Sequence, residues 1–146
     1  MRRAIAGGYE LDDDPARIQL DVVCDYLATE YWSSHRSREE QERLVRASTR
    51  VVGAYGAAGE QVGFCRVVSD GGAFAWLGDV WVLPEHRGRG LGEELVREAV
   101  EHPAHRSLTW YLGTRDAHAL YRKFGFVDGH DRTMTRPGDQ WSEADE

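Results

Sequence analysis

The stretch from Leu77 to Val100 constrains the fold of this chain more than any other, because a strand signal, a glycine-rich loop and a helix signal follow one another in it. Residues Ala75–Leu83 form a nearly continuous apolar run, which is typical of a strand buried on both faces in mid-sheet. Pro84 then ends the strand, because proline has no N–H for the ladder. Behind the loop at 87–92, apolar residues at helical spacing predict an amphipathic helix.

A glycine loop between a strand and a helix N-terminus predicts an anion-binding site. The loop has the sequence RGRGLG, so its glycines leave backbone N–H groups uncovered between two guanidinium groups. These groups and the positive end of the helix dipole favour negative charge. The sequence therefore predicts that the loop holds a phosphorylated ligand.

The rest of the chain predicts an α/β (α+β) domain with a mixed, mostly antiparallel sheet. Three strand signals between residues 50 and 83 are separated by turn residues, which favours an antiparallel meander. The strand signal at 107–113 follows a helix, so we expect it to run parallel to the strand before that helix. The predicted elements are strands Tyr9–Leu11, Arg50–Tyr55, Gln61–Val68, Phe74–Leu83, Ser107–Gly113 and Phe126–Thr135, and helices Ala16–Ala28, Arg38–Ala47, one from the loop to His102, and Ala117–Phe124.

The chain is expected to form one domain over residues 1–146, with its core at about 9–135, because no repeat or linker divides it. Residues 1–8 are expected to be a loose leader, and the acidic segment at about 137–146 a frayed tail. Asp116 is a candidate N-cap for the helix at 117–124, and Gly125 a candidate left-handed residue after it.

Charge and cysteine content narrow the class of protein. A net charge of −7 disfavours a nucleic-acid partner and adhesion to an anionic membrane. Cys24 and Cys65 have no metal-ligand spacing and are expected to be reduced, mostly buried thiols, so no metal is predicted. The sequence has neither a signal-peptide core nor the roughly 20 apolar residues of a membrane span, so the cytoplasm is the expected location.

The glycine pattern differs from two common nucleotide-binding loops. The dinucleotide motif GxGxxG would need glycine where this chain has Glu93, and its fold would begin with parallel strands rather than a meander. A P-loop would need a Gly-Lys-Ser/Thr sequence, which is absent.

Two motifs together resemble the GCN5-related N-acetyltransferase (GNAT) superfamily. RGRGLG at 87–92 is similar to the core of that family's acyl-CoA loop, Q/R-x-x-G-x-G/A. About thirty residues later, AHALYRKFGF at 117–126 resembles its second signature, A-x-x-L-Y-x-K-x-G-F. With the element order, the resemblance covers about residues 9–135 and implies a central sheet flanked by helices, with strands splayed apart at the acyl-CoA site.

The resemblance implies acetyl-CoA as co-substrate and assigns its contacts. The glycine loop would hold the pyrophosphate with backbone amides, and the end of the strand before it would bond the pantetheine arm through its main chain. Side chains on that strand are equally compatible with core packing. The implied cofactor-binding residues are Val80, Trp81, Val82, Arg87, Gly88, Arg89, Gly90, Leu91, Gly92 and Glu93.

Acyl transfer from a thioester to an amine needs a neutral amine, a polarised carbonyl and a proton for the departing sulfur. Tyr121 matches the family tyrosine that acts as general acid; the alternative is that it only packs on the cofactor. Asp79 is a possible base, because a carboxylate in a cleft can have a raised pKa. Strand alternation places Asp79 on the face opposite Val80, so it is also expected to accept bonds from a neighbouring loop. A water chain and His118 are further alternatives.

The chain departs from the family pattern at one contact position. Many relatives have asparagine seven residues before the tyrosine, where this chain has Thr114, which keeps a hydroxyl for the cofactor. The acceptor is expected to be recognised between the first two helices, where Tyr31, Trp32 and Arg36 lie. The alternative is that the aromatic pair anchors this junction to the sheet.

The resulting prediction is an acetyl-CoA-dependent N-acetyltransferase that acts by direct attack of a primary amine in a ternary complex. A small-molecule acceptor is favoured, and the protein is expected to be a monomer or homodimer. The alternatives are a non-catalytic acyl-CoA-binding sensor or interaction module, and an enzyme that acetylates protein lysines or N-termini.

Overall fold

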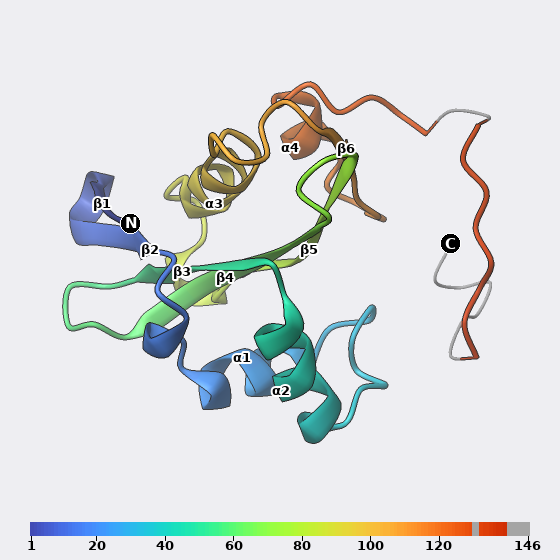
Figure 1. The fold of residues 1–146 in the computed structure, drawn as a ribbon. Helices are drawn as coiled ribbons and strands as arrows, with labels where there is room; N and C mark the ends of the chain where they lie inside the picture. The colour runs from blue at the N-terminus through green and yellow to red at the C-terminus, as the bar shows by residue number, and fades with distance from the viewer. Residues whose placement is uncertain (130–131, 140–146) are drawn as a thin grey trace.

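A computed structural model describes residues 1–129 and 132–139, and within them six strands form one sheet with helices on both faces (Figure 1). The strands lie in sequence order, and every neighbouring pair is antiparallel except the last, which is parallel as predicted. The strands are β1 (Arg2–Ile5), β2 (Tyr9–Asp12), β3 (Arg50–Tyr55), β4 (Gln61–Ser69), β5 (Phe74–Val82) and β6 (Thr109–Tyr111).

Two pairs of helices cover the two faces of the sheet. Helices α1 (Leu20–Leu27) and α2 (Arg38–Ala47) lie on one face, and α3 (Leu91–Val100) and α4 (His118–Arg122) on the other (Figure 1). The α3 side contains the larger core. It includes Leu11, Val52, Val62, Val67, Leu77, Leu91, Leu95 and Val96. The α1 side contains a smaller core of Val23, Leu27, Val45, Val51, Phe64 and Trp81.

Local signals explain the elements whose bounds were predicted closely. Helix α2 begins at a capping box, in which the Ser37 side chain accepts from the Glu40 N–H and the Glu40 carboxylate accepts from the Ser37 N–H. Its bounds, like those of β3, are the predicted ones. Helix α3 begins directly after Gly90, whose φ of 81° is the left-handed conformation that favours glycine.

The strands β5 and β6 separate after a short paired segment. Pairing runs only from Phe74↔Thr109 to Trp76↔Tyr111, whereas β5 continues to Val82. Asp79, in this unpaired part, has a φ of 53°, and the register with β4 shifts at the same place. The expected splaying of strands is therefore confirmed; we call β5 residues 77–82 and the chain after Tyr111 the fork.

The N-terminal predictions were partly wrong. Residues 2–5 are not a loose leader but β1, since Arg3 bonds Glu94 and Glu98 of α3 and thereby anchors this edge. The predicted helix at 16–28 is a short 3-10 turn, Pro15–Arg17, followed by α1. The break comes at Gln19, whose N–H bonds the side chain of Gln61 in β4 and whose backbone is extended.

The C-terminal predictions also needed correction. Asp116 does not cap α4; instead the Thr114 hydroxyl accepts the Ala117 N–H. Gly125 is left-handed as predicted, with a φ of 86°. The predicted last strand is not formed at 126–129 or 132–135, where Asp128 instead pairs with Arg122 of α4. Residues 130–131 of that segment and 140–146 of the predicted tail lie outside the described residues.

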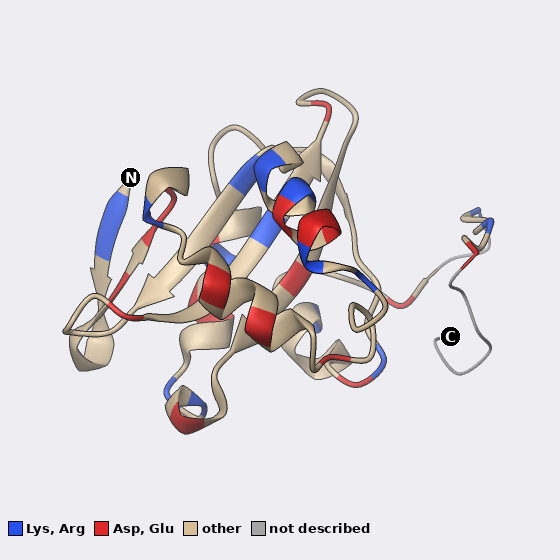
Figure 2. Cartoon of the chain, turned by 90° about the horizontal axis from the view of Figure 1, so that it is seen from below, with Lys and Arg blue, Asp and Glu red and all other residues tan. Residues whose placement is uncertain are grey.

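Charged groups are distributed unevenly on the face that α1 and α2 cover (Figure 2). Helix α1 carries only acidic charges, Asp21 and Asp25, whereas α2 carries both signs. In the part of the chain that the structure describes, no helix combines the length and apolarity needed to cross a membrane, and no group of three or more His, Cys, Asp or Glu could hold a metal ion. Both cysteines are buried.

Candidate active site

The candidate site is a cleft of about 680 Å³ at the fork, between the glycine loop, α4 and the segment joining α1 to α2. It brings together most of the residues predicted from the two motifs, although they are widely separated in sequence. The lining residues include Tyr26, Glu30, Tyr31, Trp32, Val80, Trp81, Val82, His86, Arg87, Gly88, Gly90, Leu91, Gly92, Glu93, Arg115, Asp116 and Tyr121.

The glycine loop has the backbone expected of an anion cradle. Gly88 and Gly90 have φ values of 78° and 81°, and a Cβ at either position would meet nothing within 4 Å. Glycine is therefore required by the left-handed conformation rather than by lack of space. The loop leads directly into the N-terminus of α3, where the first backbone N–H groups have no partner within the helix. These groups fit the phosphates of acetyl-CoA.

The two arginines of the loop have different roles. Arg87 lines the cleft, where it donates to the Val82 carbonyl at 2.9 Å and to the Tyr26 hydroxyl at 2.8 Å. Arg89 does not line the cleft; its Nη1 donates to the Tyr9 hydroxyl at 2.6 Å. Of the two predicted phosphate contacts, the structure places only the first beside the cleft.

His86 is a cleft residue for which the sequence predicted no role. Its Nδ1 lies 2.7 Å from the Tyr9 hydroxyl oxygen, which already accepts from Arg89. The proton of Tyr9 is therefore free for Nδ1, an arrangement that favours the His86 tautomer with the proton on Nε2. Because Tyr9 is far away in sequence, only the fold reveals this contact.

Beyond the irregularity at Asp79, the residues of β5 alternate between the two faces of the sheet, although Leu77 before it packs in the same core as Val80 after it. Val80 and Val82 pack with the α3 core. Trp81 points to the α1 side, stacked on Tyr26 at 4.6 Å between ring centroids and on Phe64 at 6.1 Å. Its side chain is thus a core residue at the edge of the cleft, which agrees with the packing interpretation.

Tyr121 separates the cleft from a second, outer cavity. It lines both, and its ring packs edge-on against Phe126 at 5.9 Å. Burial raises the pKa of Tyr121 to about 12. The phenol therefore keeps its proton at neutral pH and is able to donate it but not to act as a base.

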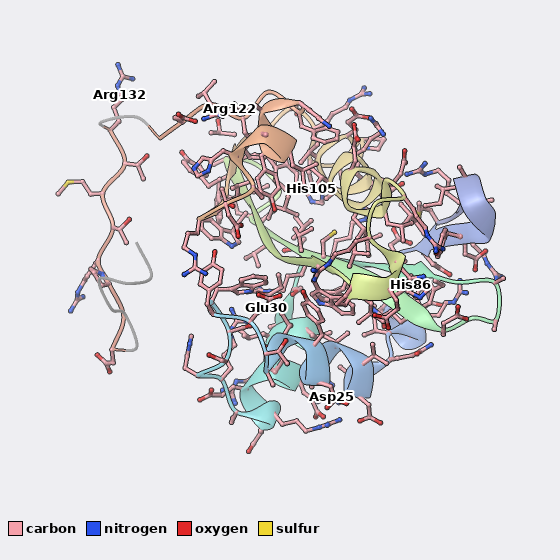
Figure 3. All side chains as sticks on the ribbon, turned by 180° about the vertical axis from the view of Figure 1, so that it is seen from behind. Asp25, Glu30, His86, His105, Arg122 and Arg132 are labelled. Atoms are coloured by element: carbon pink, nitrogen blue, oxygen red, sulfur yellow. The ribbon has the colours of Figure 1, made fainter. Side chains whose placement is uncertain are left out.

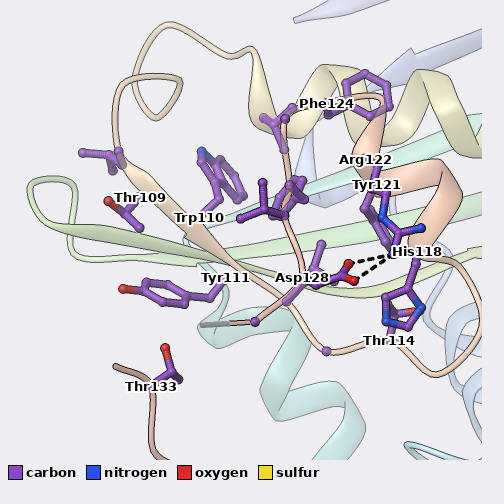
Figure 4. Close-up of a pocket in the computed structure, with 18 of the residues that line it drawn as sticks. Thr109, Trp110, Tyr111, Thr114, His118, Tyr121, Arg122, Phe124, Asp128 and Thr133 are labelled. Atoms are coloured by element: carbon purple, nitrogen blue, oxygen red, sulfur yellow. Dashed lines mark hydrogen bonds and ion pairs between the residues drawn. The ribbon is translucent and has the colours of Figure 1, made fainter. Parts of the chain in front are cut away.

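The outer cavity, of about 730 Å³, lies between β6, α4 and residues 124–129 (Figure 4). Thr114 and His118 line this cavity and not the cleft, and the Thr114 hydroxyl is occupied by the Ala117 N–H at 3.0 Å. Arg122 and Asp128 are paired at 2.7 and 3.0 Å on its wall. The glycine loop does not line this cavity, so the cleft is the better candidate for the cofactor.

Asp79 lies behind the cleft wall, with only 2% of its side chain exposed. It accepts from Trp32 Nε1 at 2.8 Å, from Arg36 Nη1 at 2.9 Å and from Arg66 Nε at 2.8 Å. Burial acts to raise the pKa of Asp79, but the charges and hydrogen bonds of the two arginines outweigh it and hold this pKa below its ordinary value. The raised pKa that would suit a base is therefore not found, and the geometry is that of the alternative, a residue bonded to a neighbouring loop.

The segment of residues 28–37, which we call the acceptor loop, contributes two of its three predicted residues to the cleft (Figure 3 labels Glu30 of this loop). Tyr31 and Trp32 line the cleft, whereas Arg36 is turned away to Asp79 and to Gln41 Oε1 at 3.0 Å. Arg115 lies over the Tyr31 ring at 3.7 Å. This cation–π contact joins the acceptor loop to the segment before α4 and was not predicted.

Comparisons with known proteins are consistent in family and fold. Residues 47–128 match the family model described as an acetyltransferase (GNAT) domain. A Gibberella zeae protein described as an acetyltransferase is 27% identical in an alignment that covers 84% of this chain and 81% of that protein. A Pyropia yezoensis protein named as an N-acetyltransferase is 31% identical in an alignment that covers 77% of this chain and 66% of that protein.

Solved structures give the same result. A Xanthomonas campestris pv. campestris protein described as belonging to the GNAT family has a TM-score of 0.83 and 33% identity, covering 89% of this chain and 93% of that one. The glucosamine-6-phosphate N-acetyltransferase of Arabidopsis thaliana has a TM-score of 0.64 over 90% of this chain and 99% of that one. At 14% identity, the latter shows a shared fold alone.

Proposed function

Since the chain belongs to the GNAT family of acetyltransferases, we propose that it is an acetyl-CoA-dependent N-acetyltransferase that modifies a primary amine, with a small molecule as the favoured acceptor. One observation carries the proposal. A single cleft runs from the glycine loop, past the part of β5 that β6 leaves unpaired, to Tyr121. It thus joins an anion cradle, free main-chain groups and a proton donor.

The cradle and the fork would bind the co-substrate. Backbone N–H groups at 88–92 and the N-terminus of α3 bind its phosphates, and Arg87 adds positive charge. Main-chain groups of Val80–Val82 on the side facing away from β4 have no β6 partner. The Val82 carbonyl accepts from Arg87, and the other groups on this side are available to bond the amides of the pantetheine arm. When bound, acetyl-CoA supplies the acetyl group as an activated thioester.

The remaining groups handle protons. Because burial raises the pKa of Tyr121 to about 12, its phenol is protonated at neutral pH and donates this proton toward the sulfur position. Glu30, Glu93 and Asp116 are carboxylates that line the cleft, and they receive the amine proton directly or through water. Asp79 does not line the cleft and is not required in this scheme.

The acceptor side of the cleft favours a small amine. Tyr31 and Trp32 meet edge-on at 5.2 Å between ring centroids, and Arg115 covers the Tyr31 ring. These groups form a compact aromatic wall. Arg36 does not reach the cleft, so it gives no reason to expect a carboxylate or phosphate on the acceptor.

The test is a screen of amino acids, polyamines, aminoglycosides and peptides for acetyl-CoA-dependent thiol release, together with calorimetric binding of CoA. We expect CoA binding, and release with at least one small amine. CoA binding without release from any amine would favour the sensor alternative. Release with peptides alone would favour a protein-modifying enzyme, and absence of CoA binding would contradict the proposal itself.

A further inference from the structure

The inference concerns Asp79 and the three donors that surround it. The side chains of Asp79, Arg66 and Arg36 are exposed by only 2%, 12% and 16%, respectively. A carboxylate and two guanidiniums are thus removed from water together, and their pairing must compensate for lost hydration. Because Asp79 Oδ2 accepts from both arginines and Oδ1 from Trp32, both of its oxygens are occupied.

The backbone at Asp79 is unusual as well. Among the described residues, Asp79 is the only residue other than glycine with a positive φ. Such a conformation in a strand persists only where the surroundings hold it. It occurs where β5 changes register against β4, three residues beyond the last pair with β6. The bonded side chain therefore lies at the point where the fork opens.

The donors come from two different parts of the fold. Arg66 belongs to β4, next to β5, whereas Trp32 and Arg36 belong to the acceptor loop. Trp32 also lines the cleft. The buried Asp79 carboxylate therefore connects two parts of the site. One is the acceptor loop, and the other is the kink of β5, by which we mean its positive-φ backbone at Asp79, beyond which the main chain of Val80–Val82 has no β6 partner.

We propose that Asp79 is a positioning residue that couples the acceptor loop to the acetyl-CoA site by holding the kink of β5. The proposal rests on the proposed function. Disturbing the acceptor loop on the side away from the cleft weakens CoA binding, and CoA in turn stabilises the acceptor loop, because coupling between two sites is reciprocal.

The decisive variant is Arg36→Met, which removes a loop anchor outside the cleft and leaves the Asp79–Arg66 pair in place. We expect the Kd of CoA, measured by calorimetry, to rise about fivefold or more, the lower end of typical coupling between sites. Amide hydrogen exchange should become faster both in residues 28–37 and in residues 80–82. Arg38→Met is the matched control, because Arg38 pairs with Asp21 and Glu42 at the surface and should leave the Kd unchanged.

Asp79→Asn separates positioning from base catalysis. Asparagine tolerates a positive φ but cannot neutralise two guanidiniums. In a positioning role, this variant raises the Kd of CoA, and Arg36→Met adds little further in its background. In a base role, the Kd stays unchanged, kcat falls, and the acidic limb of the kcat/KM profile against pH disappears.

The proposal is overturned if Arg36→Met binds CoA like the unmodified protein, or if exchange changes only in the loop. Asp79→Asn is not needed for this decision, so its failure to fold would not rescue the idea. An unmodified protein that binds no CoA would contradict the proposed function instead, and the two failures are therefore distinct.

Discussion

At the scale of single residues, proton chemistry separates the two polar groups that the sequence singled out. Tyr121 is part of the cleft wall and is kept protonated by burial. Asp79 is outside the wall and is kept ionised by two arginines. Asp79 lies on the central strand beside the proposed pantetheine segment, but Tyr121, and not Asp79, is placed to exchange a proton with bound substrates.

Replacing Tyr121 by phenylalanine tests the acid role. The ring contact with Phe126 remains, so the fold and the Kd of CoA should be nearly unchanged. Turnover should fall by about ten- to a thousandfold, toward the lower end of the roughly 10²–10⁴-fold that a general acid typically contributes, because a thiolate is already a fair leaving group. Steady-state kinetics and calorimetry on the same preparation measure both quantities. Undiminished kcat would show that Tyr121 only packs beside the cofactor.

At the scale of elements, the loop that precedes α3 depends on glycine for conformation. Gly90→Ala places a Cβ in open space, so its effect is backbone strain at a φ of 81°. We expect a loss of about 1 kcal/mol in unfolding free energy and a weaker affinity for CoA. Urea unfolding and calorimetry measure these two changes.

Gly59→Ala is the matched control for that prediction. Gly59 also has a positive φ, of 83°, and open space at its Cβ, but it lies in the β3–β4 turn away from the cleft. It should show a similar loss of stability with unchanged affinity for CoA. Equal loss of affinity in both variants would mean that general destabilisation, and not the loop, controls binding.

Elements with local signals were predictable from sequence, and those held by distant partners were not. The capping box at Ser37 and the turn residues around β3 and β4 act over a few positions. Strand β1 depends instead on Arg3 reaching Glu94 and Glu98, more than ninety residues away. In the site, the glycine motif and Tyr121 were found because each stands in a short run of residues that resembles a GNAT signature, whereas the contacts of Asp79 and His86 exist only after folding.

At the scale of the whole molecule, several carboxylates make stability depend on pH. The pKa values of Asp12, Asp13 and Asp79 are all lowered; burial opposes the shift in each, and cationic or backbone donors outweigh it. A lowered pKa in the folded state means that the unfolded state binds more protons as the pH falls. The stabilisation that these carboxylates provide is therefore present above their pKa in the unfolded state, about 4, and is lost as the pH falls below that value.

We expect thermal unfolding to show this loss. The melting temperature should fall slightly from about pH 7 to 5, because burial lowers the pKa of His105 and the unfolded state therefore binds more protons there, and it should fall steeply below about pH 4. Asp79→Asn should melt lower at pH 7, with the gap narrowing toward pH 3. Asp25→Asn, at an exposed position on α1, should stay within about 0.5 kcal/mol of the parent at pH 7. A gap that stays constant with pH would show that the Asp79 carboxylate contributes no titratable stability.

Two of the five tryptophans lie at the cleft. Trp81 stacks on Tyr26 and Phe64, and Trp32 donates a hydrogen bond to Asp79. Indole emission depends on the polarity and contacts of the ring. The protein therefore carries its own optical reporters, one beside each half of the reaction. Substituting them one at a time would allow donor and acceptor occupancy to be followed separately, in unlabelled protein and in real time.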